Sequence, residues 1–407
     1  MTATRDLDVL AVQQLRSTAA VRERANFLLE RAREGGSRWF VVDDDGLAHA
    51  ADEVAAETRR RHPDLDIPYH SRWRHFEAGG EDRKALLDTM LADSAPARRA
   101  HTWVDLTVVS VLLDAGAGPS WRYRETDTGG VFARSEGLGV ASCHAFTAGL
   151  FSSDPADPLR CDAAGLRALT VARLAEAFQV TADNPLVGLD GRVALLHRFG
   201  DVLARRGEVF GDLGRPGCLY DTFGAELTAH DLLSTVLQLM SDIWPAQNMI
   251  GDVPLGDCWR HDAVPGAGPS RGWMPLHKLS QWLTYSLLEP FEWAGAAVRG
   301  LDDLTGLAEY RNGGLLLDTA ALRLRDPALA RRAWAPADEL IVEWRALTVA
   351  LLDRLAPLVR QRLGLDAERL PLARVLEGGT WWAGRKLAQQ LRDGLPPLTV
   401  DSDGTVF

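Results

Sequence analysis

The sequence lacks long hydrophobic runs and paired cysteines. Its four cysteines, Cys143, Cys161, Cys218 and Cys258, are scattered, and none forms a C-x-x-C pair. Structural zinc and a disulfide framework are therefore not expected, and a reducing cytoplasm is the default setting. No stretch approaches the ~20 apolar residues of a membrane helix. The first residues, MTATRDLDVL, have no apolar core behind basic residues, so no signal peptide is expected.

Basic residues are also fewer than acidic residues. The 407 residues carry 45 Lys and Arg against 56 Asp and Glu, which gives a net charge of −11. General binding to nucleic acid or to an anionic membrane surface would need a basic patch and is not expected. A small anionic molecule bound by a local arginine cluster remains compatible with this charge. We therefore expect a small-molecule partner.

Common catalytic motifs are missing as well. The sequence has no G-x-S-x-G elbow, no Walker loop and no H-E-x-x-H, which argues against the commonest serine-hydrolase, nucleotide-triphosphatase and zinc-protease chemistries. Two hydrophobic residues followed by Asp43 and Asp44 resemble the start of a phosphoribosyl-diphosphate motif. The small-residue phosphate loop that should follow is absent, so a helix cap is the favoured interpretation.

Hydrophobic periodicity predicts a mainly α, multi-helix globular enzyme whose long polar loops surround one pocket. We find no internal repeat and no alternating strand series. The whole chain, 1–407, reads as a single domain, although two helical lobes with a boundary near 155–165 are conceivable. The predicted helices cover 5–33, 47–61, 83–92, 98–114, 137–150, 162–178, 192–206, 221–243, 336–363 with a kink or interruption near Pro357, and 370–393.

The stretch 273–318 carries the clearest candidate site. Pro275 suits the first position of a helix, and His277, Gln281 and Tyr285 then follow at a spacing of four residues. Such spacing places all three on one stripe of a largely apolar helix. A ligand pocket needs this kind of wall, with a few hydrogen-bonding groups on an apolar surface.

The same stretch ends in Glu309-Tyr310-Arg311-Asn312, followed by two glycines. An acid, a phenol, a guanidinium and an amide thus occur within four residues. Lys278, beside the polar stripe, could supply a second cation. A capped helix followed by an ordinary turn explains the pattern about equally well.

Three further loops are rich in cationic, acidic or aromatic residues. Residues 62–80 are too polar and too rich in proline for a regular element. Binding of a phosphate or a sugar hydroxyl is the favoured use of this loop, and a metal site from His70 and His75 is the weaker alternative. Ser135 could cap the helix that follows it and leave Arg134 facing an anion. The third loop is the long glycine- and proline-rich segment 251–273. The candidates from all three loops are Arg72, Trp73, Arg74, His75, Arg134, Glu136, Asp257 and Trp259.

Several of these segments resemble one family. It is a former domain of unknown function that is associated with the non-classical uracil catabolism (Urc) pathway of fungi and bacteria. The resemblance implies a functional link to other enzymes of that pathway, in which ribosylurea and urea appear. The segments that carry it are 68–80, 112–118, 134–138, 151–155, 277–286 and 309–314.

A fainter similarity concerns the queuosine-salvage nucleotide hydrolases. Lys278-x-x-Gln281 and, about thirty residues later, Glu309-Tyr310-Arg311 are similar to their Lys-x-x-Gln and Asp-Tyr-Arg runs. Those enzymes are helical, are related to helix-hairpin-helix glycosylases, and cleave an N-glycosidic bond without a metal. The similarity implies that Glu309 takes the place of their acid and Lys278 that of a substrate-binding lysine. Glutamate in place of aspartate is a departure from that pattern.

Together these resemblances imply an N-glycosidase, without metal or cofactor, that releases urea from ribosylurea or its 5′-phosphate. Glu309 would stabilise the ribosyl cation and orient water. The phosphate or hydroxyl groups would be held by Lys278, Arg72, Arg74 and Arg311, and the urea by His75, His277, Gln281 and Tyr285. Two alternatives remain, an amidohydrolase-type enzyme acting on another ring-opened intermediate and a non-catalytic partner of the ring-opening enzyme.

Overall fold

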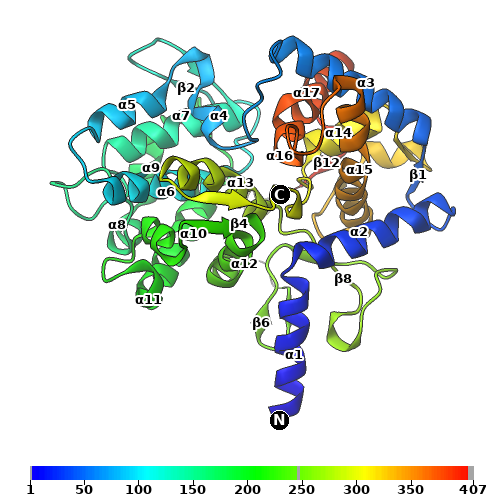
Figure 1. Cartoon of the computed structure of the whole chain (residues 1–407), viewed down its shortest axis with the longest axis horizontal. Helices are drawn as coiled ribbons and strands as arrows, with labels where there is room; N and C mark the ends of the chain where they lie inside the picture. Colours follow the sequence, from blue (N-terminus) through cyan, green and yellow to red (C-terminus); the bar gives the residue numbers. More distant parts are fainter. Residues whose placement is uncertain (1, 245–247, 402–407) are drawn as a thin grey trace. The chain divides into compact units, whose positions relative to one another are not determined.

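A computed structural model of the chain describes residues 2–244 and 248–401. Helices dominate (Figure 1), and within these residues each β-sheet consists of two short strands. The prediction of a mainly α fold is confirmed. None of the described helices combines the length and the apolar character that crossing a bilayer requires.

The chain divides into two compact units, each assembled from segments that are distant in sequence. Among the described residues, unit 1 contains 2–70, 248–281 and 300–401, and unit 2 contains 71–244 and 282–299. Helix α13 (Lys278–Trp293) contributes its first turn to unit 1 and its remainder to unit 2. The segment 155–165 lies inside unit 2.

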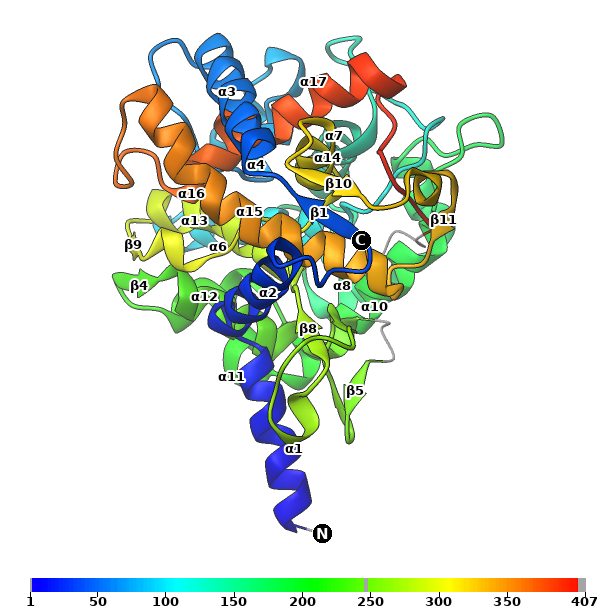
Figure 2. The same cartoon turned by 90° about the vertical axis from the view of Figure 1, so that its right-hand side faces the viewer.

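Unit 1 is built around α15, which packs against α2 and α3, while α14 packs against α17 (Figure 2). Its helices are α1 (Thr2–Leu15), α2 (Thr18–Arg33), α3 (Asp44–Arg61), α14 (Tyr310–Asp318), α15 (Glu339–Leu363), α16 (Leu372–Val375) and α17 (Trp381–Arg392). A π-helical turn, Leu376–Thr380, joins α16 to α17, and short 3-10 turns cover Gly268–Ser270, Leu301–Asp303 and Pro327–Arg331. Its strand pairs are β1 (Phe40–Val42) with β10 (Leu322–Leu324), β5 (Met249–Ile250) with β6 (Val253–Pro254), β7 (Cys258–Arg260) with β8 (Trp273–Pro275), and β11 (Ala333–Trp334) with β12 (Thr399–Val400).

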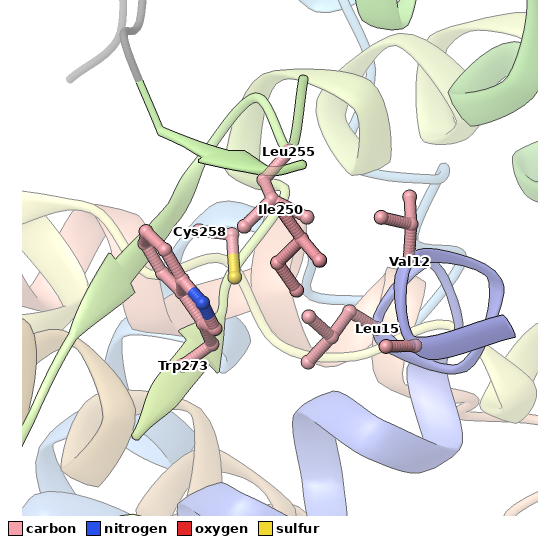
Figure 3. Packing of buried hydrophobic residues seen from close by; sticks show 7 residues of the cluster. Val12, Leu15, Ile250, Leu255, Cys258 and Trp273 are labelled. Carbon is pink, nitrogen blue, oxygen red and sulfur yellow. The ribbon is translucent and has the colours of Figure 1, made fainter. Parts of the chain in front are cut away.

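A hydrophobic cluster fixes α1 to the strands that precede α13 (Figure 3). Val12 and Leu15 at the end of α1 pack with Ile250, Cys258 and Trp273, and all five side chains are buried. Burial of each large aliphatic side chain contributes roughly 1.5–3 kcal/mol. The residues just before Lys278 are therefore held by packing as well as by strand pairing.

Unit 2 is a helical assembly in which α6 contacts α7 and α10 contacts α8. Its helices are α4 (Trp73–Phe76), α5 (Arg83–Met90), α6 (Pro96–Leu112), α7 (Arg134–Thr147), α8 (Ala163–Ala168), α9 (Val171–Ala177), α10 (Leu189–Arg205), α11 (Gly207–Phe210) and α12 (Ala229–Met240). Short 3-10 turns cover Ala78–Gly80, Pro216–Thr222 and Ser241–Ile243. Its strand pairs are β2 (Tyr123–Arg124) with β3 (Val131–Phe132) and β4 (Glu226–Thr228) with β9 (Ala297–Arg299).

Three segments that the sequence predicts as single long helices are divided into separate elements in the structure. The segment 5–33 is broken into α1 and α2, because Ser17 accepts a hydrogen bond from Ala20 N and begins a new helix. The segment 162–178 is divided in the same way into α8 and α9, where Thr170 caps the second helix. The segment 221–243 contains a 3-10 turn and β4 before α12 begins. Local caps interrupt an apolar periodicity that looks continuous in the sequence.

Predicted helix starts need two corrections. Pro275 belongs to β8, and the helix begins three residues later, at Lys278. Ser135 does not cap α7, which begins at Arg134 and has no side-chain cap. By contrast, Asp43 accepts hydrogen bonds from Asp45 N and Gly46 N and caps α3, as the helix-cap interpretation predicts.

Two further segments differ from expectation. The predicted long loop 251–273 contains the strands β6 and β7, which pair in short hairpins. Helix α15 runs through Pro357 as one element, so no interruption occurs there.

Candidate functional site

Glu309 is the N-cap of α14. Its carboxylate accepts hydrogen bonds from Arg311 N at 2.6 Å and from Asn312 N at 2.7 Å. These bonds satisfy two of the N–H groups that a helix start leaves free, and they fix the plane of the carboxylate. Each carboxylate oxygen keeps a further lone pair, so a capping carboxylate can still accept a ligand hydrogen.

The environment of Glu309 acts on its charge in two directions. The side chain is partly buried, and burial raises the pKa of its carboxyl above the usual value. The two backbone N–H groups and the charges of Lys278 and Arg311 oppose this rise without cancelling it. The result is a carboxylate that is more basic than an exposed glutamate and has two cations in its surroundings.

Lys278 is the first residue of α13, and its backbone N–H donates to Asp257 Oδ2 at 2.8 Å. Asp257 is buried and also accepts from Trp259 Nε1 at 2.6 Å. It therefore performs for α13 the capping role that Glu309 performs for α14. Within the described residues, the half-buried Lys278 ammonium group makes no hydrogen bond and no ion pair.

One buried guanidinium connects the two helix starts. Arg345 on α15 donates to both oxygens of Asp257, at 2.8 Å each, and its Nε donates to the Ala308 carbonyl at 3.2 Å. Asp257 holds the start of α13, and Ala308 immediately precedes Glu309. Arg345 thus sets the position of the segment that carries Lys278 relative to the segment that carries Glu309.

A second connection involves Gln281, one turn into α13. Its Nε2 donates to Thr305 Oγ1, and its Oε1 accepts from Thr305 N at 2.8 Å. Both residues are buried. The amide group of Gln281 is therefore used to fasten the loop that leads to Glu309, which makes it a positioning group and not a free ligand group.

Arg311 differs from the other buried arginines of unit 1. Its side chain is 3% exposed, yet Nε and Nη1 have no hydrogen-bond partner among the described residues. Arg24 and Arg345 are equally buried, and both donate to several acceptors. The Arg311 guanidinium carbon lies 5.0 Å from the Tyr310 ring centroid and 6.0 Å from that of Trp381. Buried N–H donors without acceptors are costly, and a guanidinium in this state suits an anionic ligand.

The glycines after Arg311 allow close helix packing. A Cβ at Gly313 would lie 2.7–2.8 Å from three atoms of the Trp344 ring. A Cβ at Gly384 on α17 would lie 2.3 Å from the Arg311 carbonyl oxygen. Only glycine fits at these two positions, which brings the backbone of α14 directly against α15 and α17.

The predicted stripe of His277, Gln281 and Tyr285 does not form on one helix. His277 precedes α13 and has a left-handed backbone, with φ of 49°. Its Nε2 donates to the Leu15 carbonyl at 3.0 Å, and burial lowers the pKa of its imidazole. Tyr285 lies on α13 and is fully buried. His277 therefore has a structural role that accounts for its position.

The cationic loop after residue 70 lies in unit 2 and is largely paired. Arg72 is fully buried and donates to Ser110 Oγ at 2.7 Å, while its Nη1 lies 3.0 Å from an Asp114 oxygen. Arg72 Nη1 also lies 3.0 Å from His75 Nδ1. Arg74 pairs with Glu289 at 2.8 Å.

The remaining predicted residues of unit 2 have clear structural surroundings. Trp73 is buried edge-to-face against Phe76, and its Nε1 donates to Thr107 Oγ1 at 3.1 Å. Arg134 begins α7 with φ of 55°, and Glu136 acts electrostatically on Arg72. In unit 1, His70 Nδ1 bonds Glu377 at 2.8 Å. The structure thus brings together Lys278, Gln281, Glu309, Tyr310, Arg311, Asp257 and Trp259 in unit 1 and places Arg72, Trp73, Arg74, His75, Arg134 and Glu136 in unit 2.

Sequence reasoning missed Arg345 and Thr305. Arg345 occurs with Glu343 inside the otherwise apolar run LIVEWRALTVALL. Charged residues inside such a run rarely remain buried unless they are paired. That pattern could have identified Arg345 as a residue with a buried partner. Thr305 carries no comparable signal, because its role depends only on its contact with Gln281.

In chemical terms, the Lys278–Glu309 site offers a basic carboxylate, an ammonium group and an unpaired guanidinium. A carboxylate of raised pKa can accept a proton from water or stabilise a developing positive charge. The two cations suit a phosphate or another anionic group. The site could therefore hold an anionic ligand next to a basic carboxylate.

Comparisons with known proteins place the whole chain in one group. Residues 14–407 match the family model described as a protein of unknown function (DUF1688). The chain is 38% identical to Protein urg3 of Schizosaccharomyces pombe over 412 residues, covering 97% of this chain and 99% of that protein. It is also 38% identical to Uracil catabolism protein 4 of Lachancea kluyveri over 436 residues, with the same coverage of 97% and 99%.

Proposed function

The chain belongs to the DUF1688 family, and from this premise we propose that it acts in uracil catabolism by hydrolysing an N-glycosidic bond. The proposed substrate is ribosylurea or its 5′-phosphate, and the proposed products are urea and ribose or ribose 5-phosphate. The relative named for uracil catabolism supports the metabolic setting, because it matches over nearly its whole length.

The observation that carries the proposed reaction type is a carboxylate with two cations in its surroundings. Lys278 and Arg311 both act electrostatically on Glu309, and Nε and Nη1 of the buried Arg311 have no hydrogen-bond partner among the described residues. Structural capping alone explains Glu309, but it does not explain the unpaired guanidinium beside it. An anionic sugar bound at Arg311 would bring a glycosidic carbon toward the carboxylate.

The proposed step adds one water across the C–N bond. The bond between C1 of the ribose and the urea nitrogen breaks, and its electron pair leaves with the nitrogen. Glu309 stabilises the positive charge that develops at C1 and takes a proton from the attacking water. The oxygen of this water binds C1, and the proton that Glu309 takes from the water passes to the urea nitrogen, so that atoms and charge balance and the carboxylate is regenerated.

The direct test is to supply both compounds to the full-length chain and to measure free urea. We expect release by the wild type, and a loss of about 10²–10⁴-fold in Glu309→Gln, the range typical of general acid–base groups. Glu226→Gln serves as the matched control, because Glu226 forms only an exposed pair with Arg299. The proposal is wrong if the wild type binds neither compound and releases no urea.

Arg311→Met tests the second part of the site. If the guanidinium binds the phosphate, this variant should lose affinity for the 5′-phosphate and change little with ribosylurea. The comparison requires the same thermal stability in both proteins. Equal losses with both substrates would show that Arg311 does not recognise the phosphate group.

A further inference from the structure

A group of possible metal ligands lies in unit 2, apart from every residue assigned above. His101 is on α6, while Cys218 and Asp221 are on the 3-10 turn Pro216–Thr222. One ligand atom from each residue lies within 4.8 Å of the others. Imidazole nitrogen, thiolate sulfur and carboxylate oxygen are the three donor types that Zn²⁺ accepts in proteins.

The contact between His101 and Asp221 has an unusual geometry. His101 Nε2 lies 2.8 Å from Asp221 Oδ2, but it is buried and has no hydrogen-bond partner among the described residues. The two atoms are thus close, yet they are misaligned for a hydrogen bond. A cation bound between them would give the imidazole nitrogen and the carboxylate oxygen a shared partner in place of this misaligned contact.

The turn that carries Cys218 is fixed against α6. Asp105, one helical turn after His101, accepts from Arg215 Nε and from Gly217 N, both at 2.6 Å. Asp105 is completely buried, so these bonds hold the start of the turn firmly. The anchor lies on the same face of α6 as His101, since residues four apart share a face.

Gly217 allows the 3-10 turn to lie directly against His101 on α6. A Cβ at this position would lie 2.5 Å from the His101 carbonyl oxygen and 2.7 Å from its Cα and Cβ atoms. Any larger residue would push the turn away from His101. Cys218 follows immediately, and Asp221 comes three residues later, which places both side chains on one side of a 3-10 helix. The backbone therefore presents both donors to the imidazole.

We propose that His101, Cys218 and Asp221 bind one zinc ion. The exposed fractions of the His101 and Asp221 side chains, 17% and 53%, leave a path for the ion from solvent. Three protein ligands leave a fourth tetrahedral position for water, the arrangement of zinc sites that remain open. The sequence gives no C-x-x-C signal for this site, because its ligands are contributed by elements more than one hundred residues apart.

Cobalt titration of the full-length, chelator-treated chain tests the proposal. We expect about one equivalent of Co²⁺ to bind in a tetrahedral site with a thiolate-to-cobalt charge-transfer band. Cys218→Ser should abolish this band, and Cys143→Ala should retain it, because Cys143 is buried elsewhere. Absence of the band in the wild type, or its persistence in Cys218→Ser, would overturn the assignment.

Asp221→Asn gives a second test that does not depend on a buried residue. Its side chain is about half exposed, so the substitution should not disturb folding. We expect zinc affinity to fall by at least about 10–100-fold, the loss typical even of residues that only support a ligand. Zinc should raise the melting temperature of the wild type more than that of this variant. Equal zinc affinity in the two proteins would contradict the site.

Discussion

Asp257→Asn should destabilise the segments that position Lys278 and Glu309 while leaving both of these residues unchanged. Asp257 is 7% exposed, and its carboxylate accepts four hydrogen bonds, two from Arg345, one from Lys278 N and one from Trp259 Nε1. Burial alone would raise the pKa of this carboxyl. The Arg345 guanidinium and the hydrogen bonds outweigh burial and hold the pKa below its usual value.

The expected loss of stability follows from the positions of the hydrogen-bond donors around Asp257. Each Asp257 oxygen accepts two hydrogen bonds, whereas asparagine has one oxygen and one NH₂ group. Two donors would therefore face an NH₂ group, and Arg345 would remain buried without a counter-charge. Removing one partner of a buried ion pair costs about 3–5 kcal/mol. We expect the free energy of unfolding to fall by that amount.

Urea-induced unfolding at neutral pH, followed by tryptophan fluorescence, measures the loss. The pH dependence of the free energy of unfolding tests the same interaction independently. Because the folded-state pKa of Asp257 is lowered, its contribution is present above the unfolded value of about 3.9 and is lost as the pH falls through the folded value. The wild type should therefore lose stability in that acidic window, and Asp257→Asn should lose less there.

Two controls make this test decisive. Glu226→Gln removes one partner of an exposed pair with Arg299 and should cost at most about 1 kcal/mol. The double variant Asp257→Leu/Arg345→Met removes both buried charges and should be more stable than Asp257→Asn. The role of the Asp257–Arg345 pair in joining the two helix starts is refuted if Asp257→Asn costs less than about 1 kcal/mol, or if the double variant is no more stable than Asp257→Asn.

Two other substitutions have definite outcomes. Lys278→Met removes a charge that lowers the pKa of Glu309, so the acid limb of urea release should move to higher pH; an unchanged limb would exclude that interaction. Gly313→Ala places a Cβ against the Trp344 ring and should cost about 1–3 kcal/mol in urea unfolding. Gly116→Ala meets no atom within 4 Å and should stay within about 0.5 kcal/mol, which makes it the matched control.

The helices that the sequence predicts well are those whose signals are local. Helix α3 has an acidic cap at Asp43 and ends in three arginines, both of which are visible in the sequence. The interior of α6 is apolar and follows Pro96 at its first turn. The residues at the helix start, the composition and the periodicity agree in these two helices, so that the local pattern and the tertiary fold favour the same element.

The start of α13 shows where local signals fail. Pro275 is a plausible first helical residue, but strand pairing with Cys258 places it in β8. His277 then adopts a positive φ, and its imidazole donates to Leu15, more than two hundred residues earlier. Asp257 provides the cap from a separate loop. Long-range contacts therefore decide the first residue of this helix, and spacing within the stretch carries no information about them.

The candidate site likewise contains features that the sequence indicates and features that depend on long-range contacts. Lys278, Glu309 and Arg311 are recognisable from the sequence through residue type and family resemblance. Their juxtaposition depends on Arg345, which lies 88 residues after Asp257 and contacts both segments. Residue types and the family resemblance thus single out these three candidates, whereas the residue that brings them together could not be assigned a role without the fold.

Two arginines that looked alike in the sequence now have different explanations. Both Arg72 and Arg311 occur in loops rich in aromatic and polar residues, and both are buried. Arg72 has Asp114 as a counter-charge and donates to Ser110, so its own unit accounts for it. Arg311 lies beside the Tyr310 and Trp381 rings and interacts electrostatically with Glu309, but its Nε and Nη1 have no hydrogen-bond partner among the described residues. Neither the rings nor Glu309 accepts a hydrogen bond from these two nitrogens, and a buried donor without an acceptor is costly. An acceptor on a bound ligand would satisfy them, which is why the proposed function assigns the anionic group of the substrate to Arg311 and not to Arg72.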